Sequence, residues 1–287
     1  MINKLVILAG GVSSRMKKSL EQETQLKDQT LVDAKLKPKS MIRVGKNGRP
    51  FLDYLIINAK KSGINDITIV ISEKDNSIKE YYDSIQEEHW IKEIKINYAY
   101  QKIPEGREKP LGTADALLEA LLSREDWNGE KFLMTNSDNL YSQKAMKILI
   151  TSQHKNALID YDRNGFLFEK SRVSSFAVTL KDEENFLVDI IEKPNEEQVA
   201  KATSKNGFVG VSMNIFMFTY EMILPYLKIT PFSQRNEKEL PTAIKMMINE
   251  NPKSLYCYPL SEHVPDLTSK DDIKIVQKYL EKEFDEN

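Results

Sequence analysis

A glycine pair followed by an arginine is the strongest chemical signal in the chain. The segment Leu8–Met16 reads LAGGVSSRM and follows an apolar run, Lys4–Leu8, with the character of a buried strand. Gly10 and Gly11 allow a ligand to approach the backbone closely, and backbone N–H groups there can hold phosphates. The guanidinium of Arg15 matches two phosphate oxygens at once. The spacing fits neither a Walker loop nor a GxGxxG fingerprint, so a tight turn beside a surface arginine explains the glycines equally well.

Two further segments carry groups suited to a nucleotide. The proline of KPKSM holds an extended turn, which would make Lys39 a fixed positive charge, although taken alone the segment fits a solvated lysine better. The segment Pro110–Ala116 (PLGTADA) opens a leucine-striped helix, and Gly112 at its entrance would let a flat base contact the backbone. An ordinary helix start, with Thr113 available as a cap, explains the same residues.

Acidic residues near strand ends could bind a cation or a hydroxyl group. Asp138 lies in TNSDN after an apolar run, where functional groups of open α/β sheets gather, and carboxylate oxygens suit Mg²⁺. An Asn/Asp-rich turn is the simpler alternative. Asp266 precedes a polar helix start in VPDLTSKDDI, where Ser269 could act only as a cap. The segment IIEKP ends a strand, and because adjacent residues of an extended chain point opposite ways, Glu192 and Lys193 need not bind the same group.

The hydrophobic pattern predicts the scaffold that positions these groups. Helical stripes at residues 52–59 and 114–122 alternate with apolar runs of strand character, which are Lys4–Leu8, Ile67–Ile71 and Phe132–Thr135. This alternation predicts a parallel sheet with helices on both faces. Beyond Phe166 the pattern changes to consecutive runs that predict antiparallel strands, namely Ser175–Leu180, Phe186–Glu192 and Phe208–Phe218. Two helices are expected near 239–249 and 271–284.

Composition narrows the class of protein. The chain has 287 residues, 40% hydrophobic and 29% charged, which is enough for a large α/β domain. A net charge of −2 argues against a nucleic-acid partner. The single cysteine, Cys257, excludes an internal disulfide and fits a reducing cytoplasm. No apolar run approaches the ~18 residues of a membrane span, and the N-terminal run is too short for a signal peptide. We therefore expect a cytoplasmic protein without a membrane partner.

One polar segment interrupts the alternation of strands and helices. Residues Lys17–Lys37 are rich in lysine and contain no glycine. The segment could form an exposed helix or a mobile loop, and a solvated insertion is as good an interpretation as a functional one.

Taken in order, the six motifs resemble the landmarks of a known family. LAGGVSSRM, PKSM, PLGTADA, TNSDN, IIEKP and VPDLTSKDDI are similar in order and spacing to the motifs of the sugar-phosphate nucleotidyltransferases, which include glucose-1-phosphate thymidylyl- and uridylyltransferases. The resemblance covers the chain from Lys4 to Leu280. Members of this family transfer a nucleotidyl group from a nucleoside triphosphate to a sugar 1-phosphate, giving an NDP-sugar and pyrophosphate.

The resemblance implies a fold and a division of the chain. The fold would be α/β, with a Rossmann-like mixed, mainly parallel sheet flanked by helices (a GT-A-like arrangement) and an antiparallel extension on the sugar side. Residues 1–287 would form a single nucleotidyltransferase domain. Its nucleotide-binding half would be 1–150, with the insertion at 17–37, and its sugar-phosphate-binding half would be 151–287, with the C-terminal helix.

The resemblance also implies roles for individual residues. Asp138 and Asp266 would hold Mg²⁺ across the crevice. The catalytic residues would be Arg15 on the departing pyrophosphate, Lys39 on the triphosphate or the reacting phosphate, and Lys193 on the sugar phosphate. A sugar 1-phosphate oxygen is already anionic at neutral pH, so catalysis would be positioning and electrostatic stabilisation.

The binding residues follow from the same resemblance. Glu192 would accept hydrogen bonds from sugar hydroxyls. Position alone adds Ser212 and Asn214 to the sugar pocket. The nucleotide would contact a larger set, made up of Leu8, Ala9, Gly10, Gly11, Gln101, Gly112 and Thr113.

The sequence departs from the family pattern at several places. Residues 17–37 separate the glycine loop from the PK lysine, and Ser137 stands where a glycine usually precedes the metal aspartate. The segment Asp266–Ser269 lacks the glycine of the D-x-G-T pattern, and 101–112 is longer than usual. These departures bear on the triphosphate loop, base selection and the second metal ligand more than on the class of chemistry.

Three alternatives stay open. A cytidylyl- or guanylyltransferase for a non-sugar acceptor such as phosphocholine shares the GGVSSRM start, although the IIEKP block and its following strands favour a sugar. A non-catalytic regulatory protein of the same fold would have no chemical need to keep five charged site residues, which are Arg15, Lys39, Asp138, Lys193 and Asp266. A processive glycosyltransferase fits the GG-x-S-S-R loop poorly. The sequence leaves open the base, the sugar and whether the protein forms a homo-oligomer.

Overall fold

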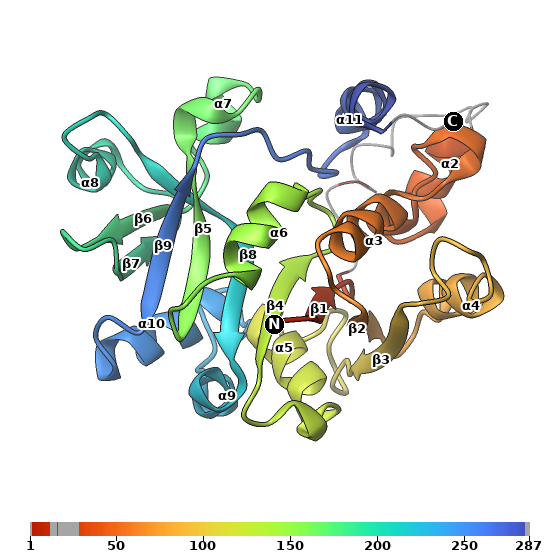
Figure 1. Ribbon diagram of the computed structural model, residues 1–287, viewed down its shortest axis with the longest axis horizontal. Coiled ribbons are helices and arrows are strands. Elements are labelled where there is room, and N and C mark those ends of the chain that lie inside the picture. Colours follow the sequence, from red (N-terminus) through yellow and green to blue (C-terminus); the bar gives the residue numbers. More distant parts are fainter. Residues whose placement is uncertain (1, 12–15, 17–28, 285–287) are drawn as a thin grey trace.

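The structure is a computed structural model that describes residues 2–11, 16 and 29–284 (Figure 1). Within these residues a nine-stranded sheet has the order β3-β2-β1-β4-β8-β5-β9, with β6 and β7 attached beside β8. The strands are β1 (Lys4–Leu8), β2 (Asp66–Ser72), β3 (Lys95–Gln101), β4 (Lys131–Asn136), β5 (Asn156–Asp162), β6 (Val178–Lys181), β7 (Leu187–Ile191), β8 (Gly210–Thr219) and β9 (Leu255–Leu260). The helices are α2 (Gln29–Leu36), α3 (Phe51–Lys61), α4 (Ser77–Ser84), α5 (Thr113–Leu122), α6 (Gln143–Ile150), α7 (Lys170–Val173), α8 (Glu196–Ala202), α9 (Tyr220–Ile229), α10 (Leu240–Glu250) and α11 (Lys270–Glu283).

The first half of the chain forms the parallel part of the sheet. Strand β1 pairs in parallel with β2 and β4, and β2 pairs in parallel with β3. Residues 5–8 of β1 are all buried, as expected for a strand covered on both faces. The predicted strands at 4–8, 67–71 and 132–135 and the two predicted helices between them are confirmed, whereas β3 was not predicted.

The second half adds antiparallel pairings. Strand β8 runs antiparallel to both β4 and β5, and β6 and β7 form an antiparallel pair that joins β8. The three predicted antiparallel strands and the two predicted C-terminal helices are confirmed. Strands β5 and β9, which pair in parallel, were not predicted. The fold is therefore the mixed, mainly parallel α/β sheet with an antiparallel extension that the sequence predicts.

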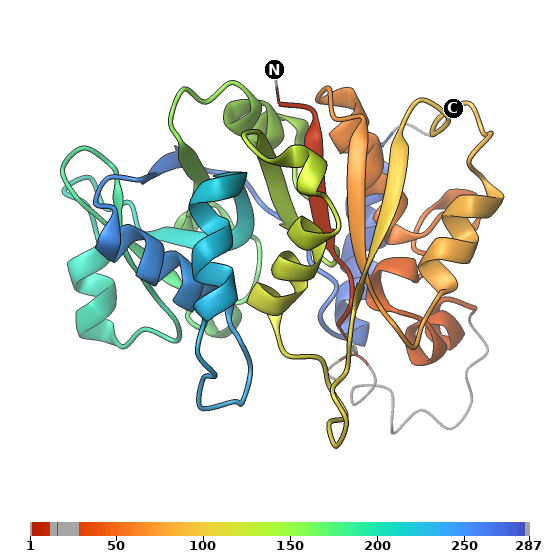
Figure 2. The same ribbon diagram turned by 90° about the horizontal axis from the view of Figure 1, so that it is seen from below.

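Two apolar clusters cover opposite faces of the sheet. Side chains of β1 alternate between them, with Leu5 and Ile7 in one cluster and Val6 and Leu8 in the other. The first cluster includes residues of α3, α6 and α11. The second includes residues of α5, α9 and α10, which Figure 2 shows together in one layer. The helices on both faces leave the ends of the strands free for a site.

One local prediction is wrong, and a second can be compared with the structure only in part. Thr113 was expected to cap α5, but Gly112 occupies the N-cap position, and the Thr113 hydroxyl accepts a hydrogen bond from the backbone N–H of Leu240. In the polar insertion, residues 17–28 lie outside the described residues. Its last part forms α2, where Asp33 is only 1% exposed and accepts hydrogen bonds from the Arg43 guanidinium. Lys35 and Leu36 are exposed, so this part is packed on one side and solvated on the other.

The single cysteine belongs to the core. Cys257 lies in β9 with no exposed surface, and burial raises the pKa of its thiol well above the usual value. Among the described helices, none is both long and apolar enough to span a membrane.

Candidate active site

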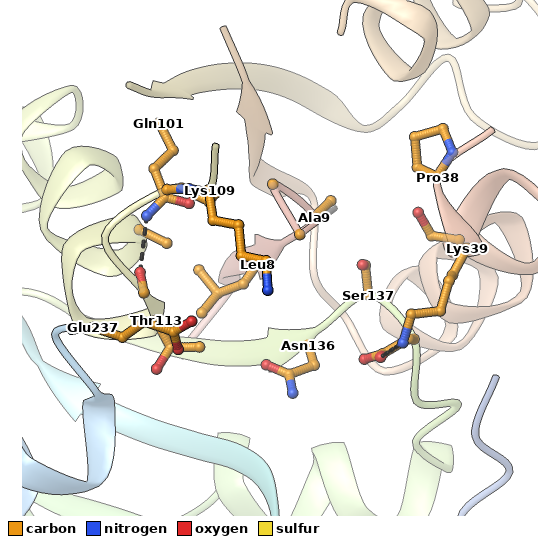
Figure 3. Close-up of a pocket in the computed structure, with 17 residues that line it drawn as sticks. Leu8, Ala9, Pro38, Lys39, Gln101, Lys109, Thr113, Asn136, Ser137 and Glu237 are labelled. Carbon is orange, nitrogen blue, oxygen red and sulfur yellow. Dashed lines mark hydrogen bonds and ion pairs between the residues drawn. The ribbon is translucent and has the colours of Figure 1, made fainter. Parts of the chain in front are cut away.

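The carboxyl ends of the parallel strands surround a first cavity of about 370 Å³ (Figure 3). Strand β1 leads into Gly10, β3 ends at Gln101 and β4 ends at Asn136, because parallel strands bring their carboxyl ends to one edge of the sheet. All seven residues that the sequence assigned to nucleotide binding line this cavity, which are Leu8, Ala9, Gly10, Gly11, Gln101, Gly112 and Thr113.

The side chain of Gln101 is held in one orientation. Its amide nitrogen donates to the carbonyl oxygen of Gly112 at 2.8 Å and to the Asp115 carboxylate at 2.9 Å. Both partners are acceptors only, so the amide group must face them and the amide oxygen must face away. That oxygen lies against Gly10, where an added Cβ atom would come within 3.0 Å of it. Glycine at this position therefore leaves the amide oxygen room within the cavity wall.

Lys39 and Asp138 form an ion pair at one side of the first cavity. Lys39 begins the helical turn Lys39–Met41, and its Nζ lies 2.7 Å from an Oδ2 atom of Asp138, which follows β4 (Figure 3). The two residues are 99 positions apart in the sequence. The ion pair holds the Lys39 side chain in place, so that Lys39 is the fixed positive charge that the PK segment predicts.

A second cavity of about 430 Å³ adjoins the first. The two cavities share four lining residues, which are Thr113, Asn136, Asp138 and Glu237. The second cavity also contains every residue that the sequence assigned to the sugar-phosphate side, which are Glu192, Lys193, Ser212 and Asn214. Asp138 therefore lies where the two cavities meet.

The two carboxylates expected to bind metal lie on segments that hydrogen-bond to each other. The N–H of Leu267 donates to the Asp138 carbonyl, and the N–H of Leu140 donates to the Pro265 carbonyl, each at 2.9 Å. Both Asp138 and Asp266 line the second cavity. Burial raises the pKa of Asp266, and the negative charge of Asp138 adds to this effect.

Two neighbours hold the Asp266 carboxylate in place. Arg172 of α7 donates to it at 2.7 Å, and the Thr268 hydroxyl donates at 2.8 Å. The guanidinium of Arg172 also bonds Asp272 and lies over the ring of Phe168. Sequence reasoning missed Arg172, which comes from a helix of four residues.

Glu192 and Lys193 line the same cavity. Strand β7 ends at Ile191, and Lys193 has a φ of 48°, in the left-handed region that non-glycine residues rarely adopt. The chain is therefore not extended at Lys193, and the alternation of a strand does not apply there. Glu192 also forms an ion pair with Arg235 at 3.3 Å. Arg235 lines the second cavity too, and the sequence did not predict it.

The segment that carries Arg235 connects the walls of both cavities. It joins α9 to α10, and it also contains Glu237, which lines both cavities. The backbone oxygen of Lys238 accepts from the N–H of Ala114 at 2.9 Å. The loop before α5 reaches the same segment through Arg107, which donates to the carbonyl oxygen of Asn236 at 2.6 Å. Arg15, the remaining predicted basic residue, lies outside the described residues.

These features define an α/β protein with a cavity at its strand ends and an adjoining polar cavity. A family model described as nucleotidyl transferase matches residues 31–267, which is most of the chain. The protein belongs to this family, as the six motifs indicate.

Sequence comparison with individual proteins supports this family membership. The chain is 27% identical over 217 residues to the bifunctional protein GlmU of Methanococcus maripaludis, covering 76% of this chain and 43% of that protein. It is 29% identical over 164 residues to a D-glycero-α-D-manno-heptose 1-phosphate guanylyltransferase of Campylobacter jejuni, covering 56% and 60% respectively. The chain thus spans about half the length of the curated relatives it matches.

A solved structure shows the same fold. A UDP-glucose pyrophosphorylase complexed with UDP-glucose superposes with a TM-score of 0.70 at 18% sequence identity, and the match covers 98% of this chain and 99% of that one.

Proposed function

We propose that the protein transfers a nucleotidyl group from a nucleoside triphosphate to a sugar 1-phosphate and releases pyrophosphate. The observation that carries the proposal is the pair of adjoining cavities that meet at Asp138. A transfer between two bound substrates needs their reacting atoms about 3–3.5 Å apart, and cavities that share lining residues allow the two substrates to meet. The first cavity, with its glycine backbone, suits the nucleotide. The second, lined by hydroxyl, amide and charged side chains, suits a phosphorylated sugar.

The two linings support a functional division of the single domain 1–287. The first cavity is lined from residues 1–150, with Glu237 as an addition from the other half. The second is lined mainly from residues 151–287. We assign nucleotide binding to the first half and sugar-phosphate binding to the second.

Charge neutralisation is the main task of the site. The attacking phosphate oxygen is already ionised at neutral pH, so no side chain has to remove a proton from it. The difficulty is to bring two polyanions together and to stabilise the charge at the α-phosphorus. Lys39 lies at the junction, and Lys193 and Arg235 lie on the acceptor side. Arg15 would neutralise the departing pyrophosphate.

The carboxylates of Asp138 and Asp266 fit a magnesium ion. Mg²⁺ is usually bound by one or two carboxylates together with substrate phosphates and waters. Burial and the negative charge of Asp138 both raise the pKa of Asp266, and a divalent cation would relieve both effects. The described residues contain no group of three or more His, Cys, Asp or Glu residues that could hold a metal, so the remaining ligands would come from substrate and water. When bound, the ion would supply positive charge to the phosphates.

The second cavity favours a sugar over a choline acceptor. Quaternary ammonium groups are bound by aromatic cages. Among the described residues that line this cavity, Phe176 is the only aromatic one. Glu192, Ser212 and Asn214 instead offer hydrogen bonds to hydroxyl groups.

A substrate matrix tests the proposal. Each common nucleoside triphosphate is combined with a panel of sugar 1-phosphates and with phosphocholine, with Mg²⁺ present, and pyrophosphate release is measured. We expect release to require both a nucleoside triphosphate and a sugar 1-phosphate. Release with phosphocholine alone among the acceptors would support the non-sugar alternative, and no release with any pair would support a regulatory protein.

A further inference from the structure

An irregularity in β8 shapes one wall of the second cavity. Between the pairs Leu158↔Phe216 and Asp160↔Ser212, the single residue 159 of β5 faces residues 213–215 of β8. Asn214, in the middle of this bulge, has a φ of 59°. Asparagine tolerates this left-handed conformation better than most residues, and a bulge redirects the side chains of its strand. Met213 and Asn214 both line the cavity as a result.

A buried tyrosine hydroxyl bonds the backbone of this bulge. The hydroxyl of Tyr141 donates to the carbonyl oxygen of Met213 at 2.6 Å and lies 3.2 Å from that of Asn214. The Tyr141 side chain is fully buried, and burial raises its pKa well above the usual value, so the hydroxyl keeps its proton. A bulge disrupts the ladder, and buried carbonyls that lose their ladder donors destabilise the fold unless another donor replaces them.

Tyr141 is itself fixed from several sides. The side-chain amide of Asn58 in α3 donates to the Tyr141 carbonyl oxygen at 2.9 Å. The Tyr141 hydroxyl also lies 3.4 Å from the side-chain oxygen of Asn139, whose backbone bridges to Asp266. One hydroxyl group thus lies between the acceptor wall on β8 and the segment that carries Asp138.

We propose that Tyr141 is a positioning residue of the acceptor site, whose hydroxyl holds the bulge at Asn214 so that Met213 and Asn214 face the bound sugar phosphate. The inference rests on the proposed function and adds a residue that does not line the cavity. Tyr141 acts through the bulge, so its removal should weaken the acceptor more than the nucleotide.

The chain contains a matched control for this test. Tyr161 of β5 pairs with Val211 of β8, is also fully buried, and its hydroxyl has no hydrogen-bond partner among the described residues. Tyr161→Phe removes the same atom at the same depth, from a strand that pairs with β8, whereas Tyr141 lies between β4 and α6. Because that hydroxyl bonds no described residue, its removal should leave the bulge unchanged.

The test compares Tyr141→Phe and Tyr161→Phe with the wild type in steady-state kinetics, varying each substrate in turn. We expect Tyr141→Phe to raise the KM for the sugar 1-phosphate about tenfold, the effect of one lost buried hydrogen bond, while the KM for the nucleotide stays within about twofold. Tyr161→Phe should change neither value. Hydrogen exchange provides a second readout, in which the amides of 212–215 should exchange faster in Tyr141→Phe alone.

Two results would overturn the inference while leaving the proposed function intact. One is an active Tyr141→Phe enzyme whose two KM values match those of Tyr161→Phe. The other is a Tyr141→Phe protein that unfolds at the assay temperature or loses both substrates equally, which would show a structural role only. If the wild type releases no pyrophosphate with any substrate pair, the proposed function fails and this inference fails with it.

Discussion

Gly112 is a position where one added methyl group should damage the first cavity. Its φ of 116° and ψ of −174° lie in a region that is essentially restricted to glycine. A Cβ atom there would come within 2.6 Å of the backbone oxygen of Lys238. Because that oxygen belongs to backbone, the contact cannot be relieved by rotating a side chain. Gly112→Ala must therefore change the local conformation or displace the segment that carries Arg235 and Glu237.

The size of the effect has two parts. The backbone strain contributes about 1–3 kcal/mol to the loss of stability. Displacing Lys238 breaks the hydrogen bond that its carbonyl accepts from Ala114, which adds about 1 kcal/mol. The expected destabilisation is about 2–4 kcal/mol, equivalent to a fall in Tm of roughly 5–15 °C for a chain of this size.

Gly63 supplies the matched control. It has a similar φ of 100°, but an added Cβ atom would meet nothing within 4 Å. Gly63→Ala should therefore show strain without the steric clash. Differential scanning calorimetry of both variants separates the two contributions, and calorimetric titration with nucleoside triphosphates measures the consequence for the cavity.

The comparison of Gly112→Ala with Gly63→Ala can refute this reasoning. We expect Gly112→Ala to lower Tm more than Gly63→Ala and to weaken nucleotide binding at least about tenfold, because the Gly112 carbonyl also holds Gln101. Equal Tm values for the two variants, or unchanged nucleotide affinity in Gly112→Ala, would show that the 230–239 segment does not depend on this contact.

Three other outcomes are expected. Lys193→Ala should raise the KM for the sugar 1-phosphate about 10–100-fold and leave the nucleotide KM nearly unchanged; equal rises in steady-state kinetics would contradict its placement. Chelation of divalent cations should abolish pyrophosphate release, and Asp138→Ala should weaken Mn²⁺ binding measured by electron paramagnetic resonance; wild-type affinity in the variant would exclude Asp138 as a ligand. Burial raises the pKa of Asp53 to about 6, above its unfolded value, so the folded state binds the proton more tightly. The free energy of unfolding should therefore fall by about 2 kcal/mol between pH 4 and 6 through this group. Asp53→Asn should remove that slope in urea titrations, and an unchanged slope would refute the assignment.

The parts of the site that could be predicted from sequence are those encoded in short segments. Gly10 follows an apolar strand directly, and Asp138 follows another, so local pattern placed both at strand ends. The rule that parallel strands share a carboxyl edge then placed them together. The ion pair of Lys39 with Asp138 joins residues 99 positions apart and was not predicted; only the resemblance assigned both residues to one site.

Other parts depend on tertiary contacts or on single backbone angles. Arg172 reaches Asp266 across 94 positions and the Tyr141 hydroxyl reaches Met213 across 72, and neither pairing leaves a periodic trace in the sequence. The sequence left open whether Glu192 and Lys193 bind the same group, because it does not show the positive φ of Lys193 that ends the alternation of the strand. Hydrophobic periodicity carries no information about such a residue.

The missed strands have a different cause. Strand β9 (LYCYPL) has partly exposed residues at 256 and 258 and a proline at 259, so it lacks the continuous apolar run of a buried strand. It pairs with β5, which itself depends on β8 from a later part of the chain. These pairings form only when the antiparallel half assembles.

The buried position of Cys257 makes the protein convenient for site-specific labelling. The sequence contains no other thiol, and this one is in the core with a raised pKa, so little reactive thiolate is available. A cysteine introduced at an exposed position of the 230–239 segment would then be the one thiol open to a fluorophore. Emission from that single probe would report directly on the segment that joins the two cavities as each substrate is added.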